Sequence, residues 1–588
     1  MTEPRGLRPR RRWEWIAVPA LAGIASALLS WNRWIRPFVD GSRELQVPAR
    51  LADGERLYRD VSYYYGPAAP WINGAALEIF GRRFAVLELI GALAAVVLLW
   101  VLYRLTRRAG SPLSAGVAAT IAAAICVGAP NGGAFLFPYA FAALFATVGA
   151  LGSLAVLTRR VERFDRLADG RAVVGALALA VSLLAKAEIG AAAAAVLVLV
   201  ALRSAAPPAE RRRILLAVLA SGALAAAGYA FAFRGIPIRS LASEGPLVLF
   251  SPPPEWRHVY RLISGLDDPA GVLSRLATAL FLSLFVLGAA WLVSRTAEDT
   301  EKPGLAETVW WVLLAAAVAL CATPVGGRIE DRLPSLLSPA PLAAALAAAW
   351  LLRARLDERG RARFLLFGFA ALASARVGGN VAYGFVTTPY AILALPALAA
   401  ASAVLVLDVL APRLARPVVF RRAAAAALLA LGAAGLVRLE RIRRAVPVAA
   451  VETAAGAVRL PEPWGRATEL ALGFLAERAR PGDGLACLPE CGFFNFATGL
   501  PNPLRQEQIL PGHLDARAEA EVAERIRSAG PRFVMVVDQA PPGWEAARFG
   551  VDYAREIARA LDERYALVGV ARSPDGVPLI RVLDRRPG

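Results

Sequence analysis

The stretch AVLELIGALAAVVLLWVLYRLTRR, residues 85–108, decides the fold, because an apolar run of membrane-spanning length ends in a cluster of arginines. A run of roughly twenty apolar residues crosses a bilayer as a helix, which satisfies its own backbone hydrogen bonds. Similar runs bring the expected number of transmembrane helices to about thirteen. The span in the quoted stretch covers about 85–103, and the others lie at about 14–31, 112–129, 134–157, 171–187, 189–203, 214–233, 270–294, 308–324, 338–354, 363–376, 389–410 and 422–437.

The composition and the distribution of charge agree with a polytopic membrane protein. Of the 588 residues, 57% are hydrophobic, and the net charge of +19 comes from arginines in short segments between the apolar runs. The positive-inside rule places such segments in the cytoplasm, so the charge indicates topology and argues against nucleic-acid binding. We expect a bacterial inner-membrane protein with a cytoplasmic N-terminus. An odd number of spans puts the C-terminal region in the periplasm, whereas an even number would put it in the cytoplasm.

Two regions of different pattern divide the chain. Residues 1–438 predict an all-α transmembrane domain, and residues 439–588 (the C-terminal region) alternate between helix and strand patterns, which predicts an α/β domain. The expected helices are RATELALGFLAERARPGD, ARAEAEVAERIRSAG and YAREIARALDERY, and the expected strands are GLACLP, FVMVVD, LVGVAR and PLIRVL. Cys487 and Cys491 form a disulfide or stay free; an oxidising compartment permits the bridge, but their spacing often misses its geometry.

The loop between the first two spans, residues 32–84 (the outer loop), carries the candidate active site. It contains FVDGSRELQVPARLADGERLYRDVSYYYGPAAPWINGAALEIFG, in which Asp40 and Glu44 are spaced to share one face of a helix. A carboxylate here either accepts a proton from an attacking hydroxyl or helps to hold a divalent cation with water and phosphate oxygens. The alternative is a solvated acidic loop with an aromatic belt at the membrane interface. The apolar residues 68–80 predict a helix in that interface.

Lys186, in LLAKAEIG at the outer end of the fifth expected span, is the strongest candidate for a functional cation. The only other lysine of the chain is Lys302. A charged side chain deep in a bilayer costs about 2.5–3.5 kcal/mol or more. Glu188, two residues away, is its expected partner. The alternative is a lysine that extends to the interface beside a local ion pair.

The outer loop resembles the first periplasmic loop of GT-C glycosyltransferases, a superfamily that includes protein O-mannosyltransferases and lipid A aminoarabinose transferases. Asp40, in DGSRE, occupies the acidic position of that family, and a helix that ends near Gly54 and a proline-containing apolar segment follow it. The usual Asp-Glu pair of the family is Asp40-Gly41 here. This departure leaves open whether Glu44 takes the second acidic role.

The resemblance implies a hexosyl or pentosyl transferase that moves a sugar from a polyprenyl-phosphate-linked donor to a lipid, glycan or protein acceptor at the periplasmic face. It implies Asp40 as the general base, supported by Glu44. Cations would stabilise the donor phosphate, and RLPSLLSPAPL resembles a stretch of the aminoarabinose transferases. The candidates are Lys186, Arg328 and Arg332 for the phosphate, and Tyr65, Glu188, Arg376, Asn380 and Tyr383 for the lining of the cavity.

Two rival functions and the question of a metal stay open. One rival is a transporter or flippase of lipid-linked saccharides, and the other is a non-catalytic partner in envelope assembly. Transporters place ionisable residues in mid-membrane and contain inverted repeats. The charges here gather at one face and the sequence contains no evident repeat, which favours the enzyme. No spacing identifies a metal site, and a divalent cation remains an alternative.

Overall fold

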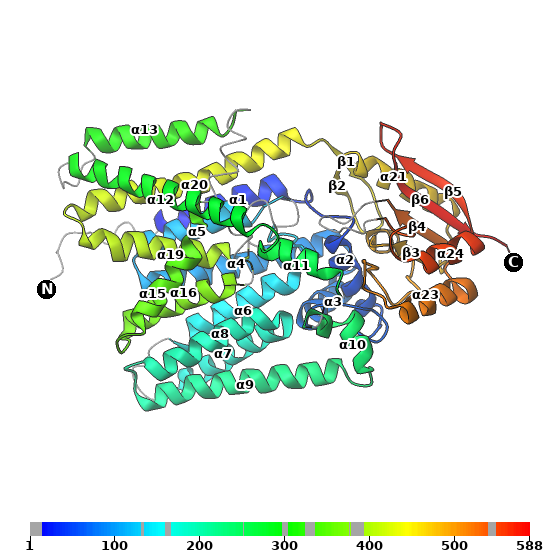
Figure 1. The fold of residues 1–588 in the computed structure, drawn as a ribbon, viewed down its shortest axis with the longest axis horizontal. Helices are drawn as coiled ribbons and strands as arrows, with labels where there is room; N and C mark the ends of the chain where they lie inside the picture. Colours follow the sequence, from blue (N-terminus) through cyan, green and yellow to red (C-terminus); the bar gives the residue numbers. More distant parts are fainter. Residues whose placement is uncertain are drawn as a thin grey trace.

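Helices dominate the computed structural model of the chain, and a small sheet lies at one end of the helical bundle (Figure 1). The described residues are 14–130, 134–158, 166–250, 252–296, 304–323, 336–375, 377, 393–538 and 548–587. A helix occupies each stretch that was expected to cross the membrane. These helices are α1 (Glu14–Ser30), α4 (Phe84–Ala109), α5 (Pro112–Cys126), α6 (Phe141–Leu157), α7 (Arg166–Ala185), α8 (Ala187–Arg203), α9 (Pro208–Ala232), α12 (Pro269–Thr296), α13 (Leu305–Leu320), α15 (Ala340–Leu351), α16 (Glu358–Ala375), α19 (Leu395–Val404) with η4 (Leu405–Leu410) and η5 (Ala411–Arg413), and α20 (Pro417–Ala445).

The apolar surface of the bundle identifies the chain as a membrane protein. Five helical segments are long and apolar enough to cross a bilayer, and they are α4, α9, α12, Leu395–Arg413 and α20. Leu93, Leu219 and Phe281 on three of these helices are exposed, as side chains that face lipid are. Six shorter apolar helices accompany them among the described residues. The number of spans itself stays a prediction.

The outer loop folds into two helices, α2 (Asp40–Ala52) and α3 (Ala68–Phe80). The second of these coincides with the helix expected at 68–80. Val39, directly before α2, has a φ of 63°. A Cβ atom at Gly41 would lie 2.4 Å from the carbonyl oxygen of Arg36. Because any side chain at position 41 would collide with this carbonyl, the start of α2 requires glycine there.

The outer loop packs against the turn that joins α7 to α8. The backbone N–H of Gly66 donates to the carbonyl of Ala185 at 3.2 Å. A Cβ atom at Gly66 would lie 1.9 Å from the carbonyl oxygen of Leu184. The hydroxyl of Tyr229, on α9, donates to the carbonyl of Leu183 at 3.1 Å. Gly66, which ends the YYYG sequence at 63–66, therefore lies against the C-terminal end of α7 at backbone-to-backbone distance.

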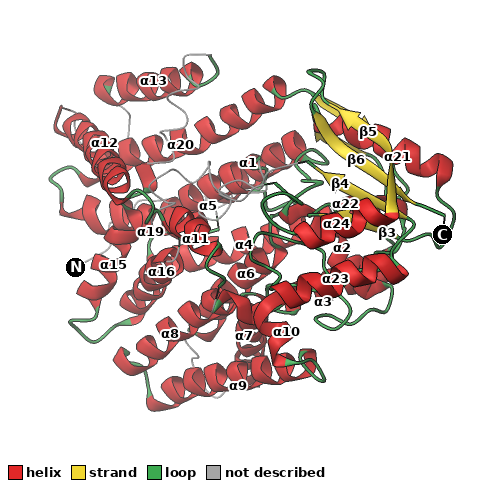
Figure 2. Ribbon diagram, turned by 45° about the vertical axis from the view of Figure 1, so that its right-hand side comes forward, coloured by secondary structure: helices red, strands yellow, loops and turns green. Residues whose placement is uncertain are grey.

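The C-terminal region is an α/β layer structure built on a four-stranded sheet (Figure 2). The strand order is β3-β4-β6-β5, with β3 parallel to β4 and the other pairs antiparallel. The predicted helices and strands of this region are all present. They are α21 (Trp464–Arg478), β3 (Leu485–Leu488), α23 (Ala516–Ala529), β4 (Phe533–Val537), α24 (Arg555–Arg564), β5 (Tyr565–Arg572) and β6 (Pro578–Arg585).

The central strand β4 shows how the layers form. Its five residues, FVMVV, are all buried. Phe533, Met535 and Val537 pack in one core cluster with residues of α21, whereas Val534 and Val536 pack in another with residues of α23 and α24. Alternate residues of a strand point to opposite faces, so helices cover both faces of the sheet. The sequence pattern did not predict the hairpin of β1 (Val448–Val451) and β2 (Val458–Pro461) or the short helix α22 (Phe493–Thr498).

An aromatic cluster joins the C-terminal region to the outer loop. Phe493 of α22 stacks on Phe84 at 5.5 Å between ring centroids, and Trp464 lies 4.9 Å from Phe38. All four residues pack against one hydrophobic cluster, so the two parts of the chain share a core. The division of the chain at 438/439 stays a prediction. In the structure α20 continues past this position and ends at Ala445. Cys487 and Cys491 are buried free thiols in the structure.

The contact at Gly66 leads to a test of how the outer loop is held. Gly66→Ala inserts a methyl group against the Leu184 carbonyl, so we expect a loss of about 1–3 kcal/mol in the free energy of unfolding. Gly222→Ala is the control, because no atom lies within 4 Å of a Cβ atom at this position of α9 and alanine favours helix. Thermal unfolding of the two purified variants measures the difference, and equal midpoints would contradict the close approach.

Candidate active site

The side chain of Arg43, in α2, lies at the centre of the candidate site. It is buried, and each of its three nitrogen atoms donates to a different residue. Nη2 donates to Asp40 Oδ1 at 3.1 Å, Nε to Glu44 Oε1 at 3.4 Å and Nη1 to Gln508 Oε1 at 2.9 Å. A buried guanidinium with these partners fixes the direction of every group that it contacts. Arg43 therefore orients the carboxylate that the sequence singled out.

Asp40 is the first residue of α2, and its side chain is 21% exposed. The N-terminus of a helix favours a negative charge, because the first backbone N–H groups have no partner within the helix. The preceding N–H, that of Val39, donates to the backbone carbonyl of Glu490 at 3.4 Å. Asp40 is thus held by Arg43 on one side and keeps an accessible edge on the other.

Glu44 lies deeper in the protein, with a side chain that is only 2% exposed. The Tyr63 hydroxyl donates to Oε1 at 3.2 Å and the backbone N–H of Phe141 to Oε2 at 3.0 Å. Burial raises the pKa of Glu44 above its ordinary value. Both carboxylate oxygens are used in contacts that join α2 to the start of α6. Glu44 thus supports the site through Arg43 and the start of α6.

Lys186 occupies the turn between α7 and α8 and is 10% exposed. Its Nζ atom lies 3.8 Å from Glu188 Oε1, as the sequence predicted, and 4.7 Å from the centroid of the Tyr65 ring. The guanidinium carbon of Arg43 lies 5.3 Å from the centroid of the same ring. Attraction between a cation and an aromatic face is substantial when water is excluded. The Tyr65 ring therefore brings the Asp40–Arg43 pair and Lys186 into one neighbourhood.

The other predicted residues fall elsewhere. Arg328, Arg332, Arg376, Asn380 and Tyr383 lie outside the described residues. Within the part of the chain that the structure describes, no group of three or more His, Cys, Asp and Glu side chains is placed to hold a metal ion. Since Glu44 uses both of its oxygens, Asp40 is the member of the predicted acidic pair with an edge left for a ligand.

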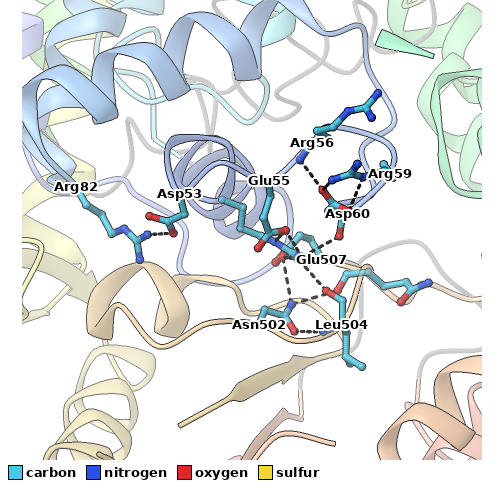
Figure 3. A network of polar contacts seen from close by, with 11 residues as sticks. Asp53, Glu55, Arg56, Arg59, Asp60, Arg82, Asn502, Leu504 and Glu507 are labelled. Atoms are coloured by element: carbon cyan, nitrogen blue, oxygen red, sulfur yellow. Dashed lines mark hydrogen bonds and ion pairs between the residues drawn. The ribbon is translucent and has the colours of Figure 1, made fainter. Parts of the chain in front are cut away.

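The segment 502–508 (the connecting segment) of the C-terminal region contacts α2 through a run of polar side chains. Arg50 of α2 pairs with Glu507, donates to the Leu504 carbonyl at 2.8 Å and contacts Glu55. Asn502 Nδ2 donates to Glu507 at 3.2 Å (Figure 3). These contacts anchor the connecting segment to the C-terminal half of α2.

The same segment also contacts the loop that follows α9. The Arg505 guanidinium pairs with Glu244 at 3.0 Å, and Gln506 Nε2 donates to that carboxylate at 2.7 Å. Glu244 ends α10 (Ile238–Glu244), which precedes η2 (Pro246–Leu249) and α11 (Trp256–Ser264). Trp256 Nε1 donates to the carbonyl of Pro511 at 3.0 Å. The loop at 234–269 therefore docks on the C-terminal region beside the candidate site.

Sequence reasoning missed Arg43, Gln508, Glu490 and His513. Arg43 stands within the DGSRE motif, but nothing distinguishes it from the many other arginines of the chain. Glu490 lies between the two cysteines of CLPEC, which drew attention to the thiols instead. Burial, followed by the charge of Asp40, raises the pKa of Glu490 to about 8. The clustering of polar residues in RQEQ, 505–508, within an otherwise apolar stretch is the signal that was available.

His513 lies between the outer loop and the connecting segment. Its Nδ1 atom is 3.1 Å from both the Tyr64 hydroxyl and the backbone carbonyl of Gln508. Its ring meets the Tyr64 ring edge-on, with 4.9 Å between centroids. Burial lowers the pKa of His513 to about 4, so the folded protein holds this imidazole neutral.

Comparison with known proteins gives a likeness at the level of overall structure. No family model matches the chain, and no curated protein matches it. The oligosaccharyltransferase of Archaeoglobus fulgidus aligns at 15% identity and a TM-score of 0.47, over 95% of this chain and 72% of that chain, in a structure with zinc and sulfate. ArnT from Cupriavidus metallidurans aligns at 15% identity and a TM-score of 0.44, over 97% of each chain.

Two further structures extend this comparison. Cupriavidus ArnT bound to undecaprenyl phosphate aligns at 13% identity and a TM-score of 0.45, over 97% of each chain. The mycobacterial arabinofuranosyltransferase AftD aligns at 14% identity and a TM-score of 0.40, over 99% of this chain and 40% of that chain. The likeness is one of overall fold, and it assigns no reaction to this chain.

The buried imidazole predicts an acid-sensitive fold. Above pH 6.5, the ordinary pKa of histidine, His513 is neutral whether the chain is folded or not. As the pH falls from 6.5 to 4, the unfolded state takes up a proton that the folded state excludes, so His513 lowers the free energy of unfolding by up to about 3 kcal/mol. In His513→Asn this dependence of the free energy of unfolding on pH should be absent. Denaturant unfolding of both proteins between pH 7 and 4 measures it, and identical slopes would exclude His513 as the cause.

Proposed function

We propose that this chain is a membrane glycosyltransferase that moves a sugar from a polyprenyl-phosphate-linked donor to an acceptor hydroxyl at the periplasmic face. One observation carries the proposal. Arg43, which pairs with the accessible carboxylate of Asp40, and the cation Lys186 both lie against the Tyr65 ring, at the end of the bundle that faces the C-terminal region. The resemblance of the outer loop to GT-C enzymes supports the same reaction. The acceptor belongs to the lipids, glycans or proteins of the envelope.

Asp40 acts as the general base in this proposal. Its position requires the acceptor hydroxyl to approach the exposed edge of the carboxylate, opposite the Arg43 contact. As the acceptor oxygen attacks the anomeric carbon, its proton passes to Asp40. The bond between that carbon and the phosphate oxygen breaks on the opposite face, and its electron pair leaves with the phosphate. Direct displacement of this kind inverts the anomeric configuration.

Lys186 stabilises the phosphate that leaves. Negative charge grows on the phosphate oxygen as the bond breaks, and a fixed cation lowers the energy of that charge most where water is excluded. Lys186 directly precedes α8, whose N-terminus adds positive potential at the same place. Arg328 and Arg332, outside the described residues, are the further predicted phosphate contacts. Because one carboxylate edge is not a metal site by itself, no step is assigned to a divalent cation.

The base assignment is tested with Asp40→Asn, which keeps the shape of the side chain but removes its basicity. We expect kcat to fall by about 10²–10⁴-fold. Transfer is measured in nanodiscs with a panel of synthetic undecaprenyl-phosphate hexoses and pentoses and membrane extract as the acceptor. Asp53→Asn is the control, since Asp53 belongs to the same loop, is exposed and pairs with Arg82. An Asp40→Asn variant of normal activity would refute the assignment.

Lys186 is tested by its effect on the donor. Lys186→Gln should raise the KM for the undecaprenyl-phosphate sugar about tenfold or more and leave the KM for the acceptor unchanged, while Lys186→Arg should recover part of the loss. Arg59→Gln, which removes an exposed cation of the outer loop paired with Asp60, is the control. An unchanged donor KM in Lys186→Gln would leave Lys186 without a role in donor binding.

The rival function is tested with the protein reconstituted in vesicles. Donor lipid that crosses the bilayer without being consumed would favour the flippase.

A further inference from the structure

Helix α2 presents two buried arginines to the connecting segment. Arg43 and Arg50 are seven residues apart, which is close to two helical turns, so they project from the same side of the helix. Two neighbouring residues of the connecting segment contact these arginines: Glu507 pairs with Arg50, and Gln508 accepts a hydrogen bond from Arg43. One arginine therefore meets a carboxylate and the other meets a neutral amide.

The difference in charge between these two partners has a chemical consequence. Arg50 and Glu507 form a buried ion pair, in which the carboxylate of the connecting segment balances the guanidinium. The Gln508 amide holds Arg43 through a hydrogen bond at 2.9 Å but adds no charge. The guanidinium of Arg43 is thus left to interact with the carboxylates of α2, among them Asp40. A carboxylate at 508 would compete with Asp40 for the same cation.

The orientation of the Gln508 amide is fixed from behind by Glu490. Gln508 Nε2 donates to Glu490 Oε1, so its oxygen faces Arg43. The reversed amide would set an NH2 group against the guanidinium, donor against donor. The backbone of Gln508 is held as well, through the contact of its carbonyl with His513 Nδ1 at 3.1 Å. The backbone carbonyl of Glu490 also accepts from Val39, directly before Asp40.

We propose that Gln508 and Glu490, from the C-terminal region, are positioning residues that complete the active site by setting Arg43 and, through it, Asp40. This inference rests on the proposed role of Asp40 as the base. The contacts run from Glu490 to Gln508, from Gln508 to Arg43 and from Arg43 to Asp40, and each is a direct hydrogen bond. The C-terminal region thus acts on the rate of transfer and not only on stability.

The decisive variant is Gln508→Glu, which keeps the size of the side chain and adds a charge. We expect kcat to fall about tenfold or more, the donor KM to stay within twofold and the acid limb of the pH profile of kcat to move to higher pH. The matched control is Glu507→Gln, which breaks the neighbouring ion pair with Arg50 and lowers stability but leaves kcat and the pH profile of the folded protein unchanged. All are measured on the full chain in nanodiscs, beside unfolding midpoints.

A second pair of variants tests the inference independently of how Gln508→Glu folds. Glu490→Gln retains an oxygen that accepts from Gln508, so it should keep kcat within about twofold, whereas Glu490→Leu should lower kcat about tenfold. Equal kcat in these two variants, or a Gln508→Glu variant that matches Glu507→Gln, would overturn the positioning role. Those results are separate from the failure of the proposed function, which would appear as no sugar transfer by the unchanged protein, and from the failure of the base assignment, which an active Asp40→Asn variant would show.

Discussion

The buried guanidinium of Arg43 is the interaction on which the rest of this site depends. A charge removed from water is stable only when its partners surround it, and here two carboxylates and an amide do so. These partners come from the outer loop and from a segment 465 residues further along the chain. Satisfying one buried cation thereby forces the outer loop and the C-terminal region to meet in one arrangement, with Asp40 at its accessible edge.

Most of the fold was predictable because it follows from periodicity and composition. Long apolar runs predicted the transmembrane helices, and a short continuous apolar run, FVMVV, predicted β4 between helices of the C-terminal region. The hairpin of β1 and β2 was missed, since each strand has only four residues and neither is fully buried, unlike the equally short β3. The helix α22 was missed for a related reason: six residues span less than two turns, and its phenylalanines serve the shared core rather than a helical stripe.

The candidate site was predictable in part. Asp40 stood out by its spacing with Glu44 and by the resemblance of its loop to GT-C enzymes, and Lys186 stood out because a charge in an apolar span is costly. In the structure Lys186 and Arg43, the partner of Asp40, both lie against Tyr65. The residues that hold Asp40 in place were not predictable, since their role depends on contacts between segments that are distant in the sequence. Nothing in the sequence around Gln508 indicates that its side chain contacts Arg43. Glu44 was correctly expected on the helix with Asp40, but only the structure reveals that its oxygens are committed to Tyr63 and Phe141.

The distance along the chain between Arg43 and Gln508 also governs when this site can exist. Ribosomes add about 5–20 residues per second, so residue 508 emerges roughly 25–90 s after residue 43. Throughout that interval the first helices are already in the bilayer, while the amide that Arg43 requires has yet to be made. A nascent chain, or one that ends before residue 508, therefore lacks the side chain that contacts Arg43 in the full protein.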